Sequence, residues 1–278
     1  MCKEFGLHIL PAFPFGEWIN FMLMLQIRDL SMAFGGLQAL NLVRFNIEKG
    51  EIFSLIGPNG SGKSTTLNCI NGFYKPQQGE ILFQENDIVG IPPHRVAPLG
   101  IARTFQNLEL FNNMKVVDNI LVGLHAHIKG RKFLKDLSKN RFVECWEWSE
   151  DQAFQVMDFL GISSFHSRIV GGLPFGIQKL VELARALAMR PKLLLLDEPS
   201  AGMNEQETYE MSKLIQDIRE EMGVTVLMVE HDMNLVIRIS DRICVLDSGA
   251  VIYQGSPEGV SQDKRVIEAY LGKEDDLA

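Results

Sequence analysis

The sequence lacks an excess of basic residues. Its 278 residues include 27 Lys and Arg against 35 Asp and Glu, which gives a formal net charge of -8. A protein that binds nucleic acid needs a basic surface to neutralise the phosphates. The charge balance therefore argues against a nucleic-acid partner, and none is expected.

Cysteine is also scarce, and its positions, Cys2, Cys69, Cys145 and Cys244, are scattered along the chain. None of them shows the close spacing of a cysteine metal site. A disulfide framework would be typical of a small protein in an oxidising compartment. We therefore expect reduced thiols, a cytosolic compartment and no cysteine-held metal.

Long uncharged apolar runs are missing as well. The longest such run near the N-terminus, residues 5–16, is too short to cross the hydrocarbon core of a membrane. A secretory signal also fits poorly, because one Lys stands beside a Glu and no small-residue cleavage site follows. The hypothesis is that residues 1–23 are a disordered extension or a mis-assigned start, and that 24–278 form the folded domain.

From Leu25 onward, short apolar strands alternate with amphipathic helices. A parallel sheet with covering helices is the usual product of that order, so the fold class is α/β. Capping-box patterns mark two helix starts, at Ser149 with Gln152 and at Asn204 with Glu207. The predicted strands are 25–30, 42–47, 51–56, 81–83, 193–196 and 224–229, with a final antiparallel pair in ICVL and VIYQ; the predicted helices are 63–71, 149–160 and 204–222.

The segment GPNGSGKS, residues 57–64, matches the phosphate-binding pattern G-x-x-x-x-G-K-[ST]. Its glycines let main-chain N–H groups turn toward a phosphate, and the following helix adds a positive dipole end. In this chemistry Lys63 reaches the β- and γ-phosphates, and the Ser64 hydroxyl ligates Mg²⁺. The predicted nucleotide-binding residues are Gly57, Pro58, Asn59, Gly60, Ser61, Gly62, Lys63, Ser64 and Thr65.

A second signal is KLLLLDEP, where an apolar strand ends in Asp197 and Glu198. Ligands bind at the carboxyl edge of such sheets, and both carboxylates fall there. We expect Asp197 to hold Mg²⁺ and Glu198 to act as the base or water-orienting group. For this pattern alone, an Asp that caps a helix is the competing interpretation.

Two further polar residues are candidates for the same edge. His231 follows the apolar strand VTVLMV, where an imidazole could bond the γ-phosphate or the attacking water. A lone His is more often a surface or core residue. Gln106, in RTFQNLELF, is a weaker signal when it is taken singly.

Taken in order, these motifs resemble the nucleotide-binding subunit of ABC transporters over about residues 25–272. The resemblance implies an antiparallel β subdomain at the N-terminus and a helical signature subdomain inserted at 108–190, with 255–278 as a short tail. It implies ATP and Mg²⁺ as cofactors, Gln106 as a catalytic and Mg²⁺ residue, and Phe34 as the aromatic side chain on the adenine. A core position is the alternative for Phe34.

The resemblance places LPFGIQ at the signature turn, which contacts the ATP of a second, head-to-tail subunit. The residues expected to act in trans are Leu173, Gly176, Ile177 and Gln178. The usual form is LSGGQ, and the departures are Pro174, Phe175 and Ile177. Because Pro174 has no N–H or hydroxyl to offer, contacts would come from Gly176 and from main-chain N–H groups of the following helix, with Phe175 packing beside the turn.

Within the family, the chain looks like the longer ATPase of branched-chain amino acid importers. The stretches that carry this are FGGLQAL, ARTFQNLELF, the helical insert after NILVG, DEPSAGMN and VIEAYLG. The implied partners are two membrane permeases and, indirectly, an external solute-binding protein, at the cytoplasmic face of the inner membrane. Urea uptake, lipopolysaccharide export and a soluble non-transport ABC ATPase stay open as alternatives.

Residues after Gln106, namely Leu108, Leu110 and Phe111, are candidates for the groove that grips a permease. Interior packing of the helical subdomain is the competing interpretation. Asn204 stands where the family usually has Asp, and we interpret it as a variant of this branch.

Overall fold

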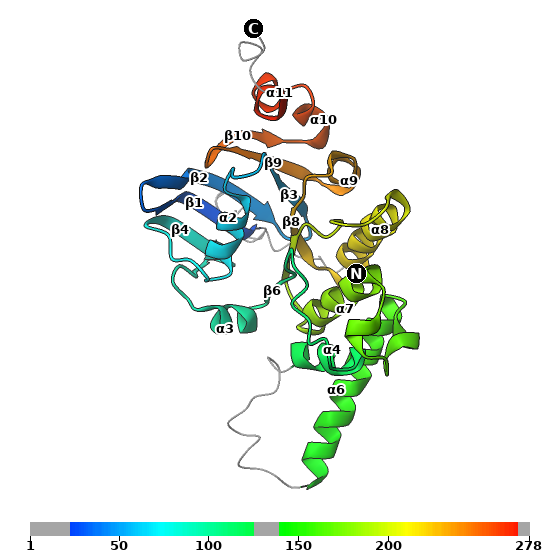
Figure 1. Cartoon of the computed structure of the whole chain (residues 1–278). Helices are drawn as coiled ribbons and strands as arrows, with labels where there is room; N and C mark the ends of the chain where they lie inside the picture. Colours follow the sequence, from blue (N-terminus) through cyan, green and yellow to red (C-terminus); the bar gives the residue numbers. More distant parts are fainter. Residues whose placement is uncertain (1–22, 125–138, 272–278) are drawn as a thin grey trace, which may run out of the picture.

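The structure, a computed structural model, describes residues 23–124 and 139–271. The expected extension 1–23 lies outside the described residues except for Leu23, which already pairs with Glu48 in the first strand. Two sheets stand beside a group of helices, and the strands and helices follow each other as an α/β fold (Figure 1).

The first sheet is antiparallel and has four strands in the order β2-β1-β4-β5. Strand β1 pairs with β2 on one side and with β4 on the other. Its buried side chains, among them Leu25, Ile27 and Leu30, pack in one core. The implied antiparallel subdomain is therefore present, and its strands are β1 Leu23–Phe34, β2 Leu37–Glu48, β4 Gln78–Phe83 and β5 Asn86–Asp87.

The second sheet has six strands in the order β10-β9-β3-β8-β7-β6. All neighbours are parallel except β9 and β10, which form the expected antiparallel pair. Strands β3, β7 and β8 are buried along their whole length, as parallel strands covered on both faces should be. The strands are β3 Ile52–Ile56, β6 Ile101–Arg103, β7 Leu193–Asp197, β8 Thr225–Val229, β9 Arg242–Asp247 and β10 Ala250–Gly255.

Side chains of β3 pack into two different hydrophobic cores, one on each face of the sheet. Ile52 and Ile56 pack with the helices of one side, whereas Phe53 and Leu55 pack with the antiparallel sheet and α2. This two-sided burial fixes the strand whose end carries the glycine-rich segment. The helices are α2 Lys63–Ile70, α3 Pro93–Val96, α4 Val116–Leu124, α6 Lys139–Phe159, α7 Phe175–Ala188, α8 Glu205–Met222 and α9 Met233–Ile239.

One predicted helix start is wrong. Ser149 does not cap a helix, because α6 runs without a break from Lys139 to Phe159 and Ser149 is buried within it. No Gly or Pro precedes Ser149 to stop the helix from extending upstream. The predicted end is correct, since Gly161 follows the helix with a φ of 68°.

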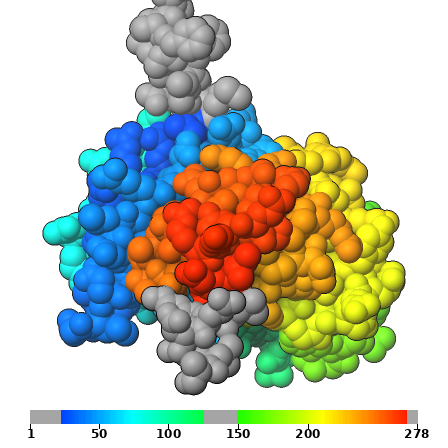
Figure 2. All heavy atoms as spheres, turned by 90° about the horizontal axis from the view of Figure 1, so that it is seen from above, coloured from blue at the N-terminus to red at the C-terminus, as the bar shows by residue number. Residues whose placement is uncertain are grey.

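The expected C-terminal tail contains two helices, α10 Pro257–Val260 and α11 Lys264–Leu271. Both pack against β10, and Figure 2 shows them in red between the blue N-terminal strands and the yellow α8. Across the described ranges 23–124 and 139–271, no helix is both long enough and apolar enough to cross a membrane.

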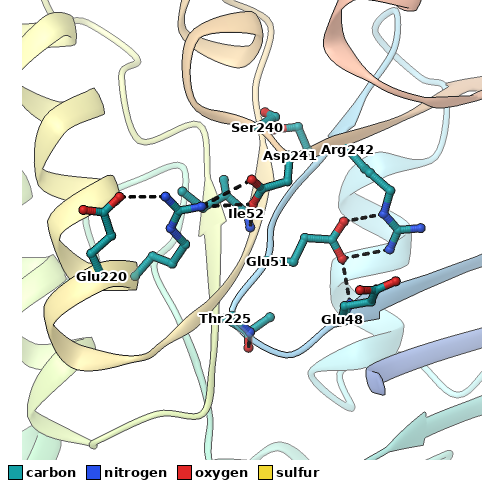
Figure 3. A network of polar contacts seen from close by, with 11 residues as sticks. Glu48, Glu51, Ile52, Glu220, Thr225, Ser240, Asp241 and Arg242 are labelled. Carbon is teal, nitrogen blue, oxygen red and sulfur yellow. Dashed lines mark hydrogen bonds and ion pairs between the residues drawn. The ribbon is translucent and has the colours of Figure 1, made fainter. Parts of the chain in front are cut away.

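A polar network joins the two sheets at the edge where β3, β8 and β9 begin (Figure 3). The carboxylate of Glu51 accepts from both Nε and Nη2 of Arg242, the latter at 2.8 Å. Arg242 also donates to the main-chain oxygen of Asn46 in β2 at 2.9 Å. Next to it, Asp241 accepts from the N–H of Ile52 and from Arg219. The network fastens the antiparallel sheet and α8 to the edge of the core sheet that lies away from the glycine-rich segment.

Candidate active site

The phosphate-binding segment lies between the end of β3 and the start of α2. Gly57 has a φ of 148°, and a Cβ there would stand 2.0 Å from the oxygen of Leu246. At Gly62, with a φ of 106°, a Cβ would stand 2.7 Å from the oxygen of Ala39. Both positions therefore require glycine, because only glycine combines this backbone with so close an approach.

Helix α2 begins directly after Gly62, which offers no side-chain cap. Its first N–H groups have no partner within the helix, so this end can accept an anion. The buried Lys63 ammonium donates to the main-chain oxygens of Gly57 at 2.7 Å and Pro58 at 2.8 Å. Burial lowers the pKa of Lys63, while the nearby carboxylates Glu198 and Asp197 act in the opposite direction.

Asp197 ends β7 and is 5% exposed. Its Oδ2 accepts from Nη2 of Arg103 at 2.8 Å, and Arg103 also donates to Asn68 of α2 at 2.7 Å. Sequence reasoning missed Arg103. The available signal was a charged residue at the last position of β6, next to the strand that ends in Asp197.

Glu198 lies in a turn with a φ of 50°, which is unusual for a residue with a side chain. Its N–H donates to the oxygen of Val229 at 2.9 Å. Its carboxylate Oε2 accepts from Nε2 of Gln106 at 2.9 Å and lies 3.8 Å from Nδ1 of His231. Two residues from distant parts of the sequence, Gln106 and His231, thus meet at the carboxylate of Glu198.

The buried Glu230 holds the turns around this group together. One of its carboxylate oxygens accepts from both the N–H and the hydroxyl of Ser200, and the other accepts from the N–H of His231 at 3.0 Å. Glu230 directly precedes His231, and sequence reasoning gave it no role. A buried acid beside a candidate His was the signal for it.

Phe34 ends β1 and is 42% exposed, so it is not a core residue. Its ring meets that of Tyr74 edge to face, with centroids 5.2 Å apart. The neighbouring strand β2 touches the phosphate-binding segment, as the approach of Ala39 to Gly62 shows. The exposed ring therefore stands on the hairpin that borders the phosphate-binding segment.

The turn LPFGIQ leads into α7, with Pro174 as N-cap and no side-chain cap bond. Leu173 is buried in the core, and its oxygen accepts from Nε2 of Gln178 at 2.8 Å. Ile177 packs partly against the same core. Because the side chain of Leu173 is buried, only its main chain is available for contacts at the turn. The side chain of Phe175, by contrast, is 47% exposed.

The residues proposed for a metal are of the kind that Mg²⁺ prefers. The Asp197 carboxylate, the Ser64 hydroxyl and the Gln106 amide supply hard oxygen ligands. In the described part of the chain, no group of three or more His, Cys, Asp or Glu could hold a metal by itself. A magnesium ion there would complete its shell with phosphate oxygens and water, as this ion commonly does.

Comparison with known proteins points to the same family that the sequence motifs resemble. A family model described as ABC transporter matches residues 40–201, and one described as Branched-chain amino acid ATP-binding cassette transporter matches residues 250–276. The high-affinity branched-chain amino acid transport ATP-binding protein BraF of Pseudomonas aeruginosa is 42% identical over 254 residues, which are 90% of this chain and 98% of that protein.

Solved structures agree with the fold. An ATP-binding cassette of an ABC transporter in its ADP conformation has a TM-score of 0.77 at 31% identity, covering 91% of this chain and 100% of that one. A dimeric cassette in a post-hydrolysis state, bound to ADP and Pi, has a TM-score of 0.72 at 27% identity, covering 84% and 99%. The chain therefore belongs to the ABC transporter family, among its ATP-binding cassette proteins.

Proposed function

We propose that the chain binds MgATP and hydrolyses it to power a branched-chain amino acid importer. Lys63 and the N–H groups at the start of α2 hold the phosphates, and Phe34 stacks on the adenine. Asp197 and Ser64 would hold Mg²⁺ together with the Gln106 amide. When bound, that ion neutralises charge that develops on the phosphates.

One observation carries the hydrolytic role. The Glu198 carboxylate is bonded by Gln106 at 2.9 Å and lies 3.8 Å from His231. Glu198 can accept a proton from water, Gln106 can orient that water, and His231 can contact a transferring phosphoryl group.

The transport role is supported by the relatives rather than by the site. The match of residues 250–276 to the branched-chain model, together with the resemblance to BraF, favours that solute class over urea uptake or lipopolysaccharide export. The proposed partners are a second ATP-binding subunit, head to tail, and two permeases at the cytoplasmic face of the membrane. Leu173, Gly176, Ile177 and Gln178 then form the turn over the partner's ATP.

The permease contact is proposed to lie after Gln106. Phe111 is 50% exposed, while Leu110 packs partly against the helical core. The side chain of Asn119 holds this loop through the N–H and oxygen of Phe111. Phe111 is therefore the stronger docking candidate, and Leu110 serves interior packing.

The proposal is tested by purifying the chain from membranes of its native host and measuring leucine uptake in vesicles that contain the purified complex. We expect two integral membrane proteins to copurify and uptake to require hydrolysable ATP. A nonhydrolysable analogue is the control. Mg²⁺-dependent hydrolysis without any copurifying membrane protein would instead indicate a soluble ABC ATPase.

A further inference from the structure

Helix α7 touches the turn of Glu198 in its own subunit through Lys179, the residue directly after the signature turn LPFGIQ. Lys179 is 5% exposed, and its Nζ donates to the main-chain oxygen of Glu198 at 3.0 Å. Burial lowers the pKa of Lys179, while the acids Glu182, Glu230, Glu198 and Asp197 act in the opposite direction. The ammonium thus bonds the main chain of the very residue whose φ is 50°.

Phe175 joins this contact to the signature turn. The Lys179 ammonium lies 5.7 Å from the centroid of the Phe175 ring, within cation–π range. The ring also lies close to Gly202, where an added Cβ would stand 3.2 Å from a ring carbon. The ring therefore bridges the signature turn and the loop that follows Glu198.

A glycine at position 175, which is the residue of the common signature form, could make neither contact. The phenyl ring is half-exposed and contributes to no described core cluster. The ring is therefore held by its contacts with Lys179 and Gly202 rather than by burial in a core. The departure from the common signature thus adds a connection between two loops of the site.

The same side of α7 also reaches the loop of Gln106. The buried carboxylate of Glu182 accepts from the N–H of Phe105 at 3.2 Å. Arg185 donates to the main-chain oxygen of Glu109. Positions 179, 182 and 185 recur at helical spacing, so one face of α7 contacts the loops of Glu198 and Gln106, two of the three that supply the proposed catalytic side chains.

We propose that Phe175 and Lys179 form a positioning pair, which couples the signature turn to the main chain of Glu198 in the same subunit. Nucleotide bound by the partner subunit meets the turn and moves α7, and the pair passes that movement to Glu198. Each hydrolytic site thereby responds to occupancy of the other. This inference rests on the proposed hydrolysis at Glu198.

The first experiment compares ATP hydrolysis by the full chain carrying Lys179→Met or Lys179→Arg. For Lys179→Met we expect kcat to fall about ten- to hundredfold, as for a misplaced catalytic group, with the KM for ATP within about twofold of wild type. The proposal also predicts a cooperative dependence of rate on ATP concentration in wild type, which Lys179→Met should lose. Lys179→Arg keeps a cation at this place and should restore most of kcat. Wild-type kcat in Lys179→Met would overturn the proposal.

A double-mutant cycle tests whether the two residues act together. Phe175→Gly should lower kcat less than Lys179→Met, and the double variant should lose no more than Lys179→Met alone. Since Phe175 is half-exposed, this variant is expected to fold even if Lys179→Met does not. Losses that multiply independently would show that no coupled pair exists.

A readout without turnover separates this inference from the proposed function. The N–H of Ala201 donates to the oxygen of Glu198, the same atom that Lys179 bonds. In Lys179→Met without nucleotide, this amide should exchange its hydrogen faster than in wild type, and an unchanged rate would overturn the pair. If wild type and Glu198→Gln hydrolyse ATP equally, the hydrolytic role of Glu198 fails instead.

Discussion

At the scale of single residues, the orientation of Glu198 depends on its main chain. Its N–H bonds Val229, its oxygen accepts from Lys179, and its φ of 50° turns the side chain toward Gln106. A side-chain-bearing residue in this region is strained and persists where its surroundings hold it. The strain coincides with the residue to which we assign the chemistry.

Lys63 is the residue whose loss should weaken nucleotide binding most directly. Its ammonium is buried beside two main-chain oxygens, and a phosphate would offer it a charged acceptor instead. We expect Lys63→Ala to reduce ATP affinity about ten- to hundredfold, the size of a charge-assisted hydrogen bond. Calorimetric titration measures this, with the exposed Lys213→Ala as control, and equal affinities in the two variants would contradict the assignment.

Some site residues could be predicted from sequence and others could not. Lys63, Asp197, Glu198 and His231 each follow a buried strand or a glycine-rich pattern, so their common location follows from the sheet. Arg103, Lys179 and Glu230 have buried charged side chains. Local pattern can mark such a charge, as at Arg103 and Glu230, but it does not identify the partners, which are main-chain atoms or side chains that the fold brings close.

At the scale of elements, the two capping-box predictions had opposite outcomes. Asn204 accepts from the N–H of Glu207, whose carboxylate accepts from the N–H of Asn204, so α8 begins as predicted. At Ser149 the same pattern fell inside a longer helix. The difference is that Gly202 and the loop before Asn204 prevent α8 from extending upstream. No glycine or proline does this in the residues directly before Ser149.

The start of α7 offers a test of how the signature turn works. Pro174 supplies no hydroxyl, and the first N–H groups of α7 lack helical partners. Pro174→Ser would add an N-cap and stabilise the chain by about 1 kcal/mol, while ATPase activity should stay within a few-fold of wild type. Urea denaturation and phosphate release measure the two effects. Many-fold faster hydrolysis would show that the missing hydroxyl limits this turn.

At the scale of the whole molecule, a parallel core sheet and a separate antiparallel sheet at the N-terminus could be predicted from pattern and family resemblance, whereas the order of the strands was not predicted. The exact strand lengths could not, since β1 extends to Phe34 through residues that break the alternation. The C-terminal segment was expected to be a short tail, with no helices predicted in it. Its two short helices pack against β10, and local sequence pattern does not reveal such a contact. Tertiary contacts decided these boundaries.

The join between the two sheets should be a main source of stability. Glu51 is 7% exposed, and Arg242→Met would leave its carboxylate without its cation, at a cost of about 3 kcal/mol. Urea midpoints at constant m-value measure this loss. The matched control is Arg28→Met, whose partner Glu80 is exposed, with an expected change of about 1 kcal/mol or less. Equal losses in both variants would mean that the network does not join the sheets.

The most direct test of hydrolysis at this site is phosphate release by Glu198→Gln in the presence of MgATP, together with calorimetric ATP binding. The substitution keeps the shape of the side chain and removes the carboxylate that would accept a proton from water. We expect binding close to wild type and a rate at least about a hundredfold lower, the usual contribution of a general base. Turnover within a few-fold of wild type would contradict the account.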